Sequence, residues 1–433
     1  MRVVITTIVS LNPGDAAILE GSLVLLREAL GDDVEVTVFD KNGPAASRLY
    51  PRVRFRTALF SKAGWGRVRR WVERRRYGHR VLWFDELRYR FAGRLMTGPL
   101  APLARLLVTG EERGSLETYL DADVVVASGG TYLVEYYNLL PPLLEYELVL
   151  ALGRPLAFFP QSLGPFRTTR FRDRLRSVFA RSQAIYLRDQ RSADNLLELG
   201  VAPAAITVCA DAAFALAGRS PAPSDVGAGE ARDADEAAPR IAVSVREWSR
   251  FDDVGAEEGR ARYLGSVAAA VSAMTRTCGA RVTFLSTCQG IPKYWTDDAR
   301  VADDVVALLP DDVAESVTVD RSFRQPGEIV AAFVGFDGVI ATRMHAAILA
   351  LCGGVPVLGI AYEFKTTELF EGLGMPEWAI PIEDLRADSF ADAAVRFVHE
   401  REELARRART GVDRLRERLR PIREGLAAGV LGG

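Results

Sequence analysis

Residues 337–365 read DGVIATRMHAAILALCGGVPVLGIAYEFK, and this stretch decides the fold class. Residues 339–341 form a short apolar run typical of a buried strand, and residues 346–351 are small and straight-chain residues typical of a helix. Two glycines, residues 353–354, are expected to end that helix before a second strand at 355–360. Strand, helix and strand in this order predict one unit of a parallel α/β sheet.

Polar side chains follow both of these strands. Arg343 and His345 lie between the first strand and the helix, and Tyr362 and Lys365 follow the second strand. The carboxyl ends of parallel strands meet at one edge of a sheet, where helix N-termini present unpaired N–H groups that favour an anion. The plain alternative is a buried, hydrogen-bonded histidine with two surface charges. Clustering of four polar groups at consecutive strand ends favours a site for phosphate or carboxylate instead.

The rest of the chain shows the same alternation in two blocks. Its 433 residues exceed the size of one hydrophobic core and predict two domains. We predict an N-terminal Rossmann-like domain at 1–216, the probable acceptor side, with a basic and aromatic excursion at 41–118. Residues 217–240 contain almost no large apolar residue and predict a flexible linker. A second Rossmann-like domain at 241–388 is the expected donor side, and charged helices at 389–433 are expected to pack back across the molecule.

These blocks together predict an α/β fold of two doubly wound Rossmann-like domains that face each other across a cleft. This is the glycosyltransferase-B arrangement, which is suited to joining a donor held in one half to an acceptor held in the other. Fold alone does not assign a reaction, so the function has to come from the residues of the site.

The sequence contains no familiar cofactor motif. A GxxxxGK[ST] phosphate loop is absent, and NPGD at 12–15 lacks the GxGxxG spacing of a dinucleotide site. The four cysteines have no paired metal-ligand spacing and the three histidines lie far apart, so neither a metal nor a bound cofactor is expected. A net charge of −2 gives no general attraction for nucleic acid.

We expect a cytoplasmic protein. Residues 1–9 resemble a signal peptide only superficially, because no small-residue cleavage site follows them. The uncharged run at 346–362 is interrupted by glycines and a proline and is shorter than the ~20 residues of a membrane helix. Residues 62–94 place arginines among aromatic residues. This segment fits a helix lying on an anionic membrane surface, and it fits equally well a solvated excursion whose aromatic residues pack on the domain.

The first half also carries polar groups at its predicted strand ends. Asn12 and Asp15 follow the first strand, where the plain alternative is a turn with an N-cap aspartate. Later strands end at Gly130, at Gln161 and at Arg188. If these strands are parallel, all five residues belong to the same edge of the sheet.

Five segments together resemble the polysaccharide pyruvyl transferases. The resemblance covers most of the chain except 41–118 and the linker. Its most specific part is Arg-x-His followed by a helix of small residues, Gly-x-Pro and Tyr-x-x-Lys. The segments are NPGDAAIL (12–19), SGGTYL (128–133), PQSLGPF (160–166), YLRDQRS (186–192) and ATRMHAAILALCGGVPVLGIAYEFK (341–365).

The resemblance implies transfer of an enolpyruvyl-derived group from phosphoenolpyruvate to two hydroxyls of one sugar, which yields a pyruvate ketal and phosphate. The acceptor would be a glycan or lipid-linked glycan of a cell-surface polysaccharide. Arg343 and Arg188 are expected to bind the phosphate and carboxylate of the donor. His345 is the expected proton donor or acceptor, and Lys365 and Arg246 are expected to hold further negative charge.

Two rival functions stay open at this point. One is a nucleotide-sugar-dependent glycosyltransferase of the same fold, in which Glu363 or Glu368 would hold a ribose. The other is a non-catalytic protein that binds glycans or membranes through the basic aromatic segment. The residues expected to contact the acceptor sugar in the pyruvyl transferase interpretation are Asn12, Asp15, Gly130, Gln161 and Tyr362.

Overall fold

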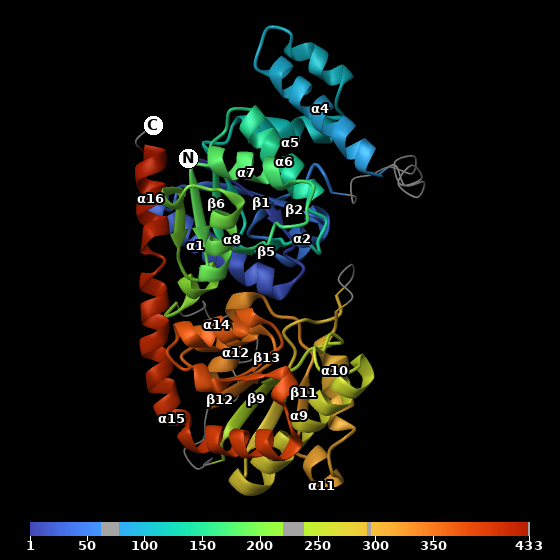
Figure 1. The fold of residues 1–433 in the computed structure, drawn as a ribbon, viewed down its shortest axis with the longest axis vertical. Helices are drawn as coiled ribbons and strands as arrows, with labels where there is room; N and C mark the ends of the chain where they lie inside the picture. The colour runs from blue at the N-terminus through green and yellow to red at the C-terminus, as the bar shows by residue number, and fades with distance from the viewer. Residues whose placement is uncertain (62–77, 220–237, 292–295, 432–433) are drawn as a thin grey trace. The chain divides into compact units, whose positions relative to one another are not determined.

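The computed structural model describes residues 1–61, 78–219, 238–291 and 296–431. The chain forms two compact units, each with its own parallel sheet (Figure 1). The first unit comprises Met1–Leu11, Ile18–Ala215 and Arg418–Gly433, and the second comprises Asn12–Ala17 and Leu216–Glu417. Residues 220–237, most of the predicted linker, and residues 62–77 of the predicted excursion lie outside the described residues.

The first unit contains a sheet in which every described pairing is parallel. Its strand order is β3-β2-β1-β4-β6-β7-β8, with β5 paired to β6. The central strands are continuous apolar runs, because both faces of a parallel sheet are covered. The described strands are β1 (Arg2–Ile8), β2 (Glu35–Asp40), β3 (Arg54–Thr57), β4 (Val124–Ala127), β5 (Gly130–Leu133), β6 (Leu156–Leu163), β7 (Ala184–Leu187) and β8 (Ile206–Val208).

Helices make the crossings between these parallel strands, as the geometry of a βαβ unit requires. The described part of the long connection from β3 to β4 contains α4, the 3₁₀ helix η3 and α5. The described helices of this unit are α1 (Pro13–Leu30), whose first residues belong to the second unit, α2 (Gly43–Leu49), α4 (Gly78–Met96), η3 (Ala101–Leu106), α5 (Gly110–Leu120), α6 (Leu140–Ala151), α7 (Arg172–Arg181), α8 (Gln190–Leu199) and α16 (Arg420–Leu431).

The second unit repeats the design with the order β11-β10-β9-β12-β13-β14. Every described pairing is again parallel. Its strands are β9 (Arg240–Ser244), β10 (Arg281–Leu285), β11 (Thr318–Asp320), β12 (Gly338–Ala341), β13 (Val357–Ala361) and β14 (Ala379–Pro381). Its helices are α9 (Ala256–Cys278), α10 (Asp298–Val306), α11 (Asp311–Ala314), α12 (Pro326–Val334), α13 (Met344–Cys352), α14 (Phe364–Gly372) and α15 (Ala387–Glu417).

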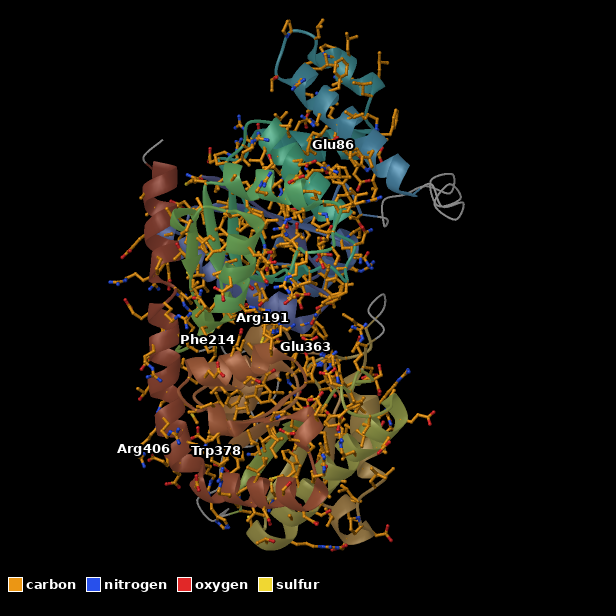
Figure 2. All side chains as sticks on the ribbon, in the orientation of Figure 1. Glu86, Arg191, Phe214, Glu363, Trp378 and Arg406 are labelled. Atoms are coloured by element: carbon orange, nitrogen blue, oxygen red, sulfur yellow. The ribbon has the colours of Figure 1, made fainter. Side chains whose placement is uncertain are left out.

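The second unit has the doubly wound order 3-2-1-4-5-6 of a Rossmann-like fold, and the eight-stranded sheet of the first unit reverses its order between β1 and β4 in the same way. This confirms the predicted fold class. Side chains fill the interior of each unit (Figure 2). In the second unit the fully buried Trp378 packs against Phe397 of α15, with ring centroids 5.8 Å apart. The strand order reverses between β1 and β4 and between β9 and β12. At such a point the loops after the two strands diverge and leave a crevice where ligands bind in open α/β sheets.

Within the connection from β3 to β4, a polar network joins α4 to α5. Both Arg88 nitrogens Nη1 and Nη2 donate to Glu112 of α5, at 2.9 and 2.7 Å, and Tyr89 donates to the same carboxylate at 2.8 Å. Burial alone would raise the pKa of Glu112, but the contact with Arg88 lowers it to about 2.

Among the described helices none is both long and apolar enough to cross a membrane.

Gly21 of α1 tests the packing of the first unit. A Cβ atom there would lie 2.0 Å from the carbonyl oxygen of Ala212, which is backbone and cannot rotate away. We expect Gly21→Ala to destabilise the unit by about 1–3 kcal/mol, a fall in Tm of roughly 2–4 °C per kcal/mol. Gly110→Ala is the matched control, because nothing lies within 4 Å of its Cβ position. Equal melting temperatures for the two variants would contradict this packing.

Candidate active site

The predicted polar groups of the second unit gather at the carboxyl edge of its sheet, at the point where the strand order reverses. Arg246 follows β9, and Arg343 follows β12 as the N-cap residue of α13. Tyr263 joins these two strand ends through its buried hydroxyl, which lies 2.8 Å from Thr342 Oγ1 and accepts a 3.3 Å hydrogen bond from the Arg246 backbone. Tyr362 follows β13, the next strand of the sheet.

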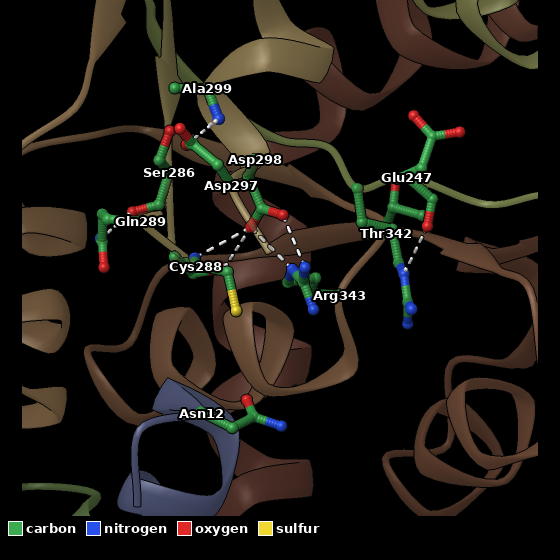
Figure 3. A network of polar contacts seen from close by, with 12 residues as sticks. Asn12, Glu247, Ser286, Cys288, Gln289, Asp297, Asp298, Ala299, Thr342 and Arg343 are labelled. Atoms are coloured by element: carbon green, nitrogen blue, oxygen red, sulfur yellow. Dashed lines mark hydrogen bonds and ion pairs between the residues drawn. The ribbon is translucent and has the colours of Figure 1, made fainter. Parts of the chain in front are cut away.

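Arg343 forms a buried, two-point ion pair with Asp298 (Figure 3). Its Nε and Nη2 atoms each donate to one carboxylate oxygen at 2.6 Å, and the Asp298 side chain is 2% exposed. Burial alone would lower the pKa of Arg343, but the Asp298 carboxylate holds it well above its usual value. Asp298 also accepts a hydrogen bond from the backbone N–H of Cys288 at 2.9 Å, so it ties the loop after β10 to the start of α13.

Sequence reasoning missed Asp298. The residue stands in an Asp-Asp pair that starts α10, where the sequence signal is that of an ordinary helix N-cap. Asp297 does serve as that cap, accepting a hydrogen bond from Ala299, while Asp298 turns toward Arg343 (Figure 3). One two-nitrogen edge of Arg343, formed by Nε and Nη2, is therefore engaged by Asp298. In Figure 3 the third nitrogen, Nη1, points away from that carboxylate.

His345 lies in the first turn of α13 and packs against the first turn of α1. A Cβ atom on Gly14 would lie 2.6 Å from His345 Nδ1, so only glycine allows this approach. The Gly14 N–H donates to Asn12 Oδ1 at 3.0 Å, which shapes the turn. Residues Asn12–Ala17 belong to the second unit, so Asn12 and Asp15 share a unit with His345. Gly14 was not among the predicted site residues, although the NPGD motif contains it.

Several charged groups of this edge act on the buried thiol of Cys288. Burial raises the pKa of this thiol to about 12, and Arg343, Asp298, Arg246 and Asp15 all lie within electrostatic range of it. The thiol is therefore protonated near neutral pH and unsuited to act as a nucleophile.

A second group at this edge combines a cation with two aromatic rings. The guanidinium of Arg246 lies 4.2 Å from the Tyr362 ring centroid and 5.3 Å from that of Trp248. The two rings are themselves 4.6 Å apart. Trp248 was not predicted, although it stands only two residues after Arg246. Stacking restrains the Arg246 side chain, which makes it a preorganised cation.

Lys365 lies in the first turn of α14 and pairs with Glu363, with 2.7 Å between Nζ and Oε2. The pair lies directly after β13, on the same strand end as Tyr362. Glu363 was one of two residues, with Glu368, expected to hold a ribose in the rival interpretation, and here its carboxylate contacts the lysine.

The remaining predicted residues lie in the first unit. Arg188 is buried, and its three nitrogens each donate at 2.7 Å, to Ser162 Oγ, Asp211 Oδ2 and Thr131 Oγ1. Gln161 is fully buried and donates to the backbone oxygen of Ser128 at 2.8 Å. Gly130 has a φ of +120°, a conformation that favours glycine. These contacts are typical of residues that shape a sheet edge, and a role for Arg188 or Gln161 in binding ligand stays a prediction.

Among the described residues no group of three or more His, Cys, Asp and Glu side chains is arranged to hold a metal ion. The site as described is instead a mixture of cations, aromatic rings, one imidazole and the N-termini of α13 and α14. Such a set suits a small anion with more than one negative group.

Residues 12–363 match the family described as "Polysaccharide pyruvyl transferase". The amylovoran biosynthesis protein AmsJ of Erwinia amylovora is 29% identical over 265 residues, which make up 61% of this chain and 62% of AmsJ. The match thus spans less than two thirds of AmsJ.

Solved structures share the fold at low sequence identity. Anabaena Alr3699/HepE in complex with UDP-glucose has a TM-score of 0.55 at 12% identity, with all of both chains covered. A putative UDP-N-acetylglucosamine 2-epimerase from Listeria monocytogenes has a TM-score of 0.53 at 12% identity and covers 97% of this chain and 96% of its own. A glycosyltransferase from Rickettsia africae gives 0.55 at 10% identity, with 99% and 98% covered. These similarities show the glycosyltransferase-B-like fold alone.

The ion pair between Arg343 and Asp298 can be tested by removing one charge. We expect Asp298→Asn to destabilise the protein by about 3–5 kcal/mol, because it leaves the Arg343 cation buried and uncompensated. Asp297→Asn is the matched control, since asparagine caps a helix as well as aspartate does and the change should cost less than about 1 kcal/mol. Denaturant unfolding measures both. If the two neighbouring variants are equally stable, Asp298 does not hold Arg343 in the folded protein.

Proposed function

Because the chain belongs to the polysaccharide pyruvyl transferase family, we propose that it transfers the pyruvyl group of phosphoenolpyruvate to a sugar of a cell-surface polysaccharide or its precursor. The observation that carries the proposal is the second unit's sheet edge, where His345 and the cations Arg343, Arg246 and Lys365 follow three of its strands. Phosphoenolpyruvate has two anionic groups on a three-carbon skeleton. A site with several cations and helix N-termini fits that charge pattern.

The proposed reaction balances without a further reactant. The methylene carbon of the donor gains a proton and becomes the methyl group of the product. Two hydroxyl oxygens of one sugar form bonds to the central carbon, and the bond from that carbon to the phosphate oxygen breaks. One hydroxyl proton ends on the methyl carbon and the other on the departing phosphate. The products are a pyruvate ketal and inorganic phosphate, with no change in oxidation state.

We assign the proton transfers to His345. An imidazole can give a proton to carbon and take one from a hydroxyl. Its place in the first turn of α13 puts it beside the backbone N–H groups that favour the donor's anionic groups. Gly14 is the residue that lets α1 approach the ring, so we assign it a positioning role.

We assign the anionic groups of the donor to Arg246, Lys365 and Arg343. Arg246 is restrained by its two aromatic neighbours, and Lys365 by Glu363. Asp298 engages the Nε and Nη2 atoms of Arg343 through one N–H each. We therefore assign the donor to the end of the guanidinium formed by Nη1 and the second N–H of Nη2. Asn12, Asp15 and Tyr362 remain candidates for the acceptor hydroxyls. In this scheme the reaction uses phosphoenolpyruvate as the donor substrate and no cofactor.

Phosphate release tests the role of His345. We expect His345→Ala to lower kcat for phosphate release from phosphoenolpyruvate by about 10²–10⁴-fold in the presence of an acceptor glycan, because a positioned acid–base group is lost. His399→Ala is the matched control, since His399 is exposed on α15. Release by His345→Ala at the rate of the parent would remove the imidazole from the mechanism. Circular dichroism of each variant checks that the fold is retained.

Ligand-induced stabilisation separates this proposal from a nucleotide-sugar glycosyltransferase of the same fold. The rival is suggested by the likeness to Anabaena Alr3699/HepE, which was solved in complex with UDP-glucose. Phosphoenolpyruvate at 100 times its Kd should stabilise the folded protein by about 2.7 kcal/mol, and UDP should not. Arg246→Gln should weaken the effect of phosphoenolpyruvate, whereas Arg250→Gln, an exposed neighbour, should leave it unchanged. Stabilisation by UDP and not by phosphoenolpyruvate would favour the rival.

A further inference from the structure

Helix α4 exposes a row of large apolar side chains to solvent. Phe84, Leu87 and Phe91 are 67%, 62% and 57% exposed. Their spacing of three and four residues places them on one side of the helix. A helix of an ordinary soluble domain turns its apolar residues toward the core and its polar residues outward. On α4, large apolar side chains therefore face solvent, where packing alone would place polar ones.

The 3₁₀ helix η3, which packs beside α4, repeats this pattern. Leu103 and Leu106, with Leu100 just before η3, are exposed, and Leu106 reaches 82%. Their spacing of three matches the period of a 3₁₀ helix, so they too lie on one side. Two consecutive elements of the same connection thus present large apolar side chains to solvent.

The exposed charge beside these residues is positive. Asp85 and Glu86 of α4 are only 1% and 4% exposed, and they pair with Arg88 and Arg90 (Glu86 is labelled in Figure 2). Between Leu82 and Val108, where every side chain is described, there is no other carboxylate. Arg94 and Arg105 are exposed on α4 and η3. An anionic partner would therefore meet no exposed carboxylate on these two elements.

The inner side of α4 is firmly held, so the exposed row is a built feature of the fold. Tyr89 is 1% exposed and packs edge-on against Phe60, with ring centroids 5.6 Å apart. Arg88 and Tyr89 both bond to Glu112. Because these contacts fix the rotation of the helix, Phe84, Leu87 and Phe91 cannot turn inward without breaking them.

We propose that this surface, formed by Phe84, Leu87, Phe91, Leu100, Leu103 and Leu106 with Arg94 and Arg105, docks on an anionic lipid membrane. Aromatic and leucine side chains enter the headgroup boundary, and arginines pair with lipid phosphates. A partner that bound through charge alone would leave the large apolar side chains of this surface in water. Because the exposed charge of the surface is positive, an anionic lipid surface is favoured over a neutral one. If the proposed function holds, docking would bring the chain to lipid-linked glycans.

Vesicle sedimentation tests the proposal with the full-length chain. The parent should sediment with phosphatidylcholine vesicles that contain phosphatidylglycerol and much less with pure phosphatidylcholine, and added salt should weaken binding. The double variant Leu87→Glu/Phe91→Glu should bind roughly tenfold or more weakly. Leu308→Glu/Val334→Glu is the matched control, because these residues of the second unit are equally exposed at 55% and 59%. Arg94→Gln/Arg105→Gln should lower binding to anionic vesicles only.

Three results would overturn the proposal. One is failure of the parent to sediment with either type of vesicle. Another is an equal loss of binding in the control pair. The third is parent self-association that Leu87→Glu/Phe91→Glu abolishes while vesicle binding is unchanged, because the surface would then be a contact between copies of the chain. Phosphate release with a soluble acceptor should be unaffected by Leu87→Glu/Phe91→Glu, so this test stands apart from the proposed reaction.

Discussion

The buried ion pair between Arg343 and Asp298 is the constraint on which the second unit's sheet edge depends. It joins the first residue of α10 to the N-cap residue of α13, two elements that are 45 residues apart in sequence. A charge buried in this way is stable only while its partner is present. The pair therefore fixes where α13 begins, and with it the direction of the His345 side chain two residues later. An acidic residue outside the recognisable motif thus controls the geometry of the motif itself.

The two sheets have one topology but different chemistry at their carboxyl edges. In the first unit, the side chains of Arg188 and Gln161 are closed off by neighbours in the same unit. In the second unit, Arg246 lies against the rings of Tyr362 and Trp248. We interpret the first edge as a rigid frame and the second as the part that carries charge for a small anionic substrate. This division is what one would expect if catalysis evolved at one of two similar crevices.

Much of the fold follows from sequence patterns because apolar runs and glycine stops have a local physical cause. The strand–helix–strand unit around residues 339–360 is such a case. Long-range pairings do not have local signatures. The carboxylate of Asp298 looks like a helix cap, and nothing near Arg188 in the sequence announces that Thr131 and Asp211 will satisfy it. The exposed row on α4 is similar, because its periodicity predicts an amphipathic helix but not which side faces the core.

The assignment of Asn12–Ala17 to the second unit, and of Arg418–Gly433 to the first, has a consequence for work with fragments. Neither unit is one uninterrupted piece of polypeptide. Cutting the gene between the two sheets would remove α16 from the N-terminal half, and it would deprive the C-terminal half of the glycine turn that lies against its imidazole. Each separately expressed half would therefore lack part of its own unit. A circularly permuted chain, or co-expression of the two halves, is the better route to studying either sheet.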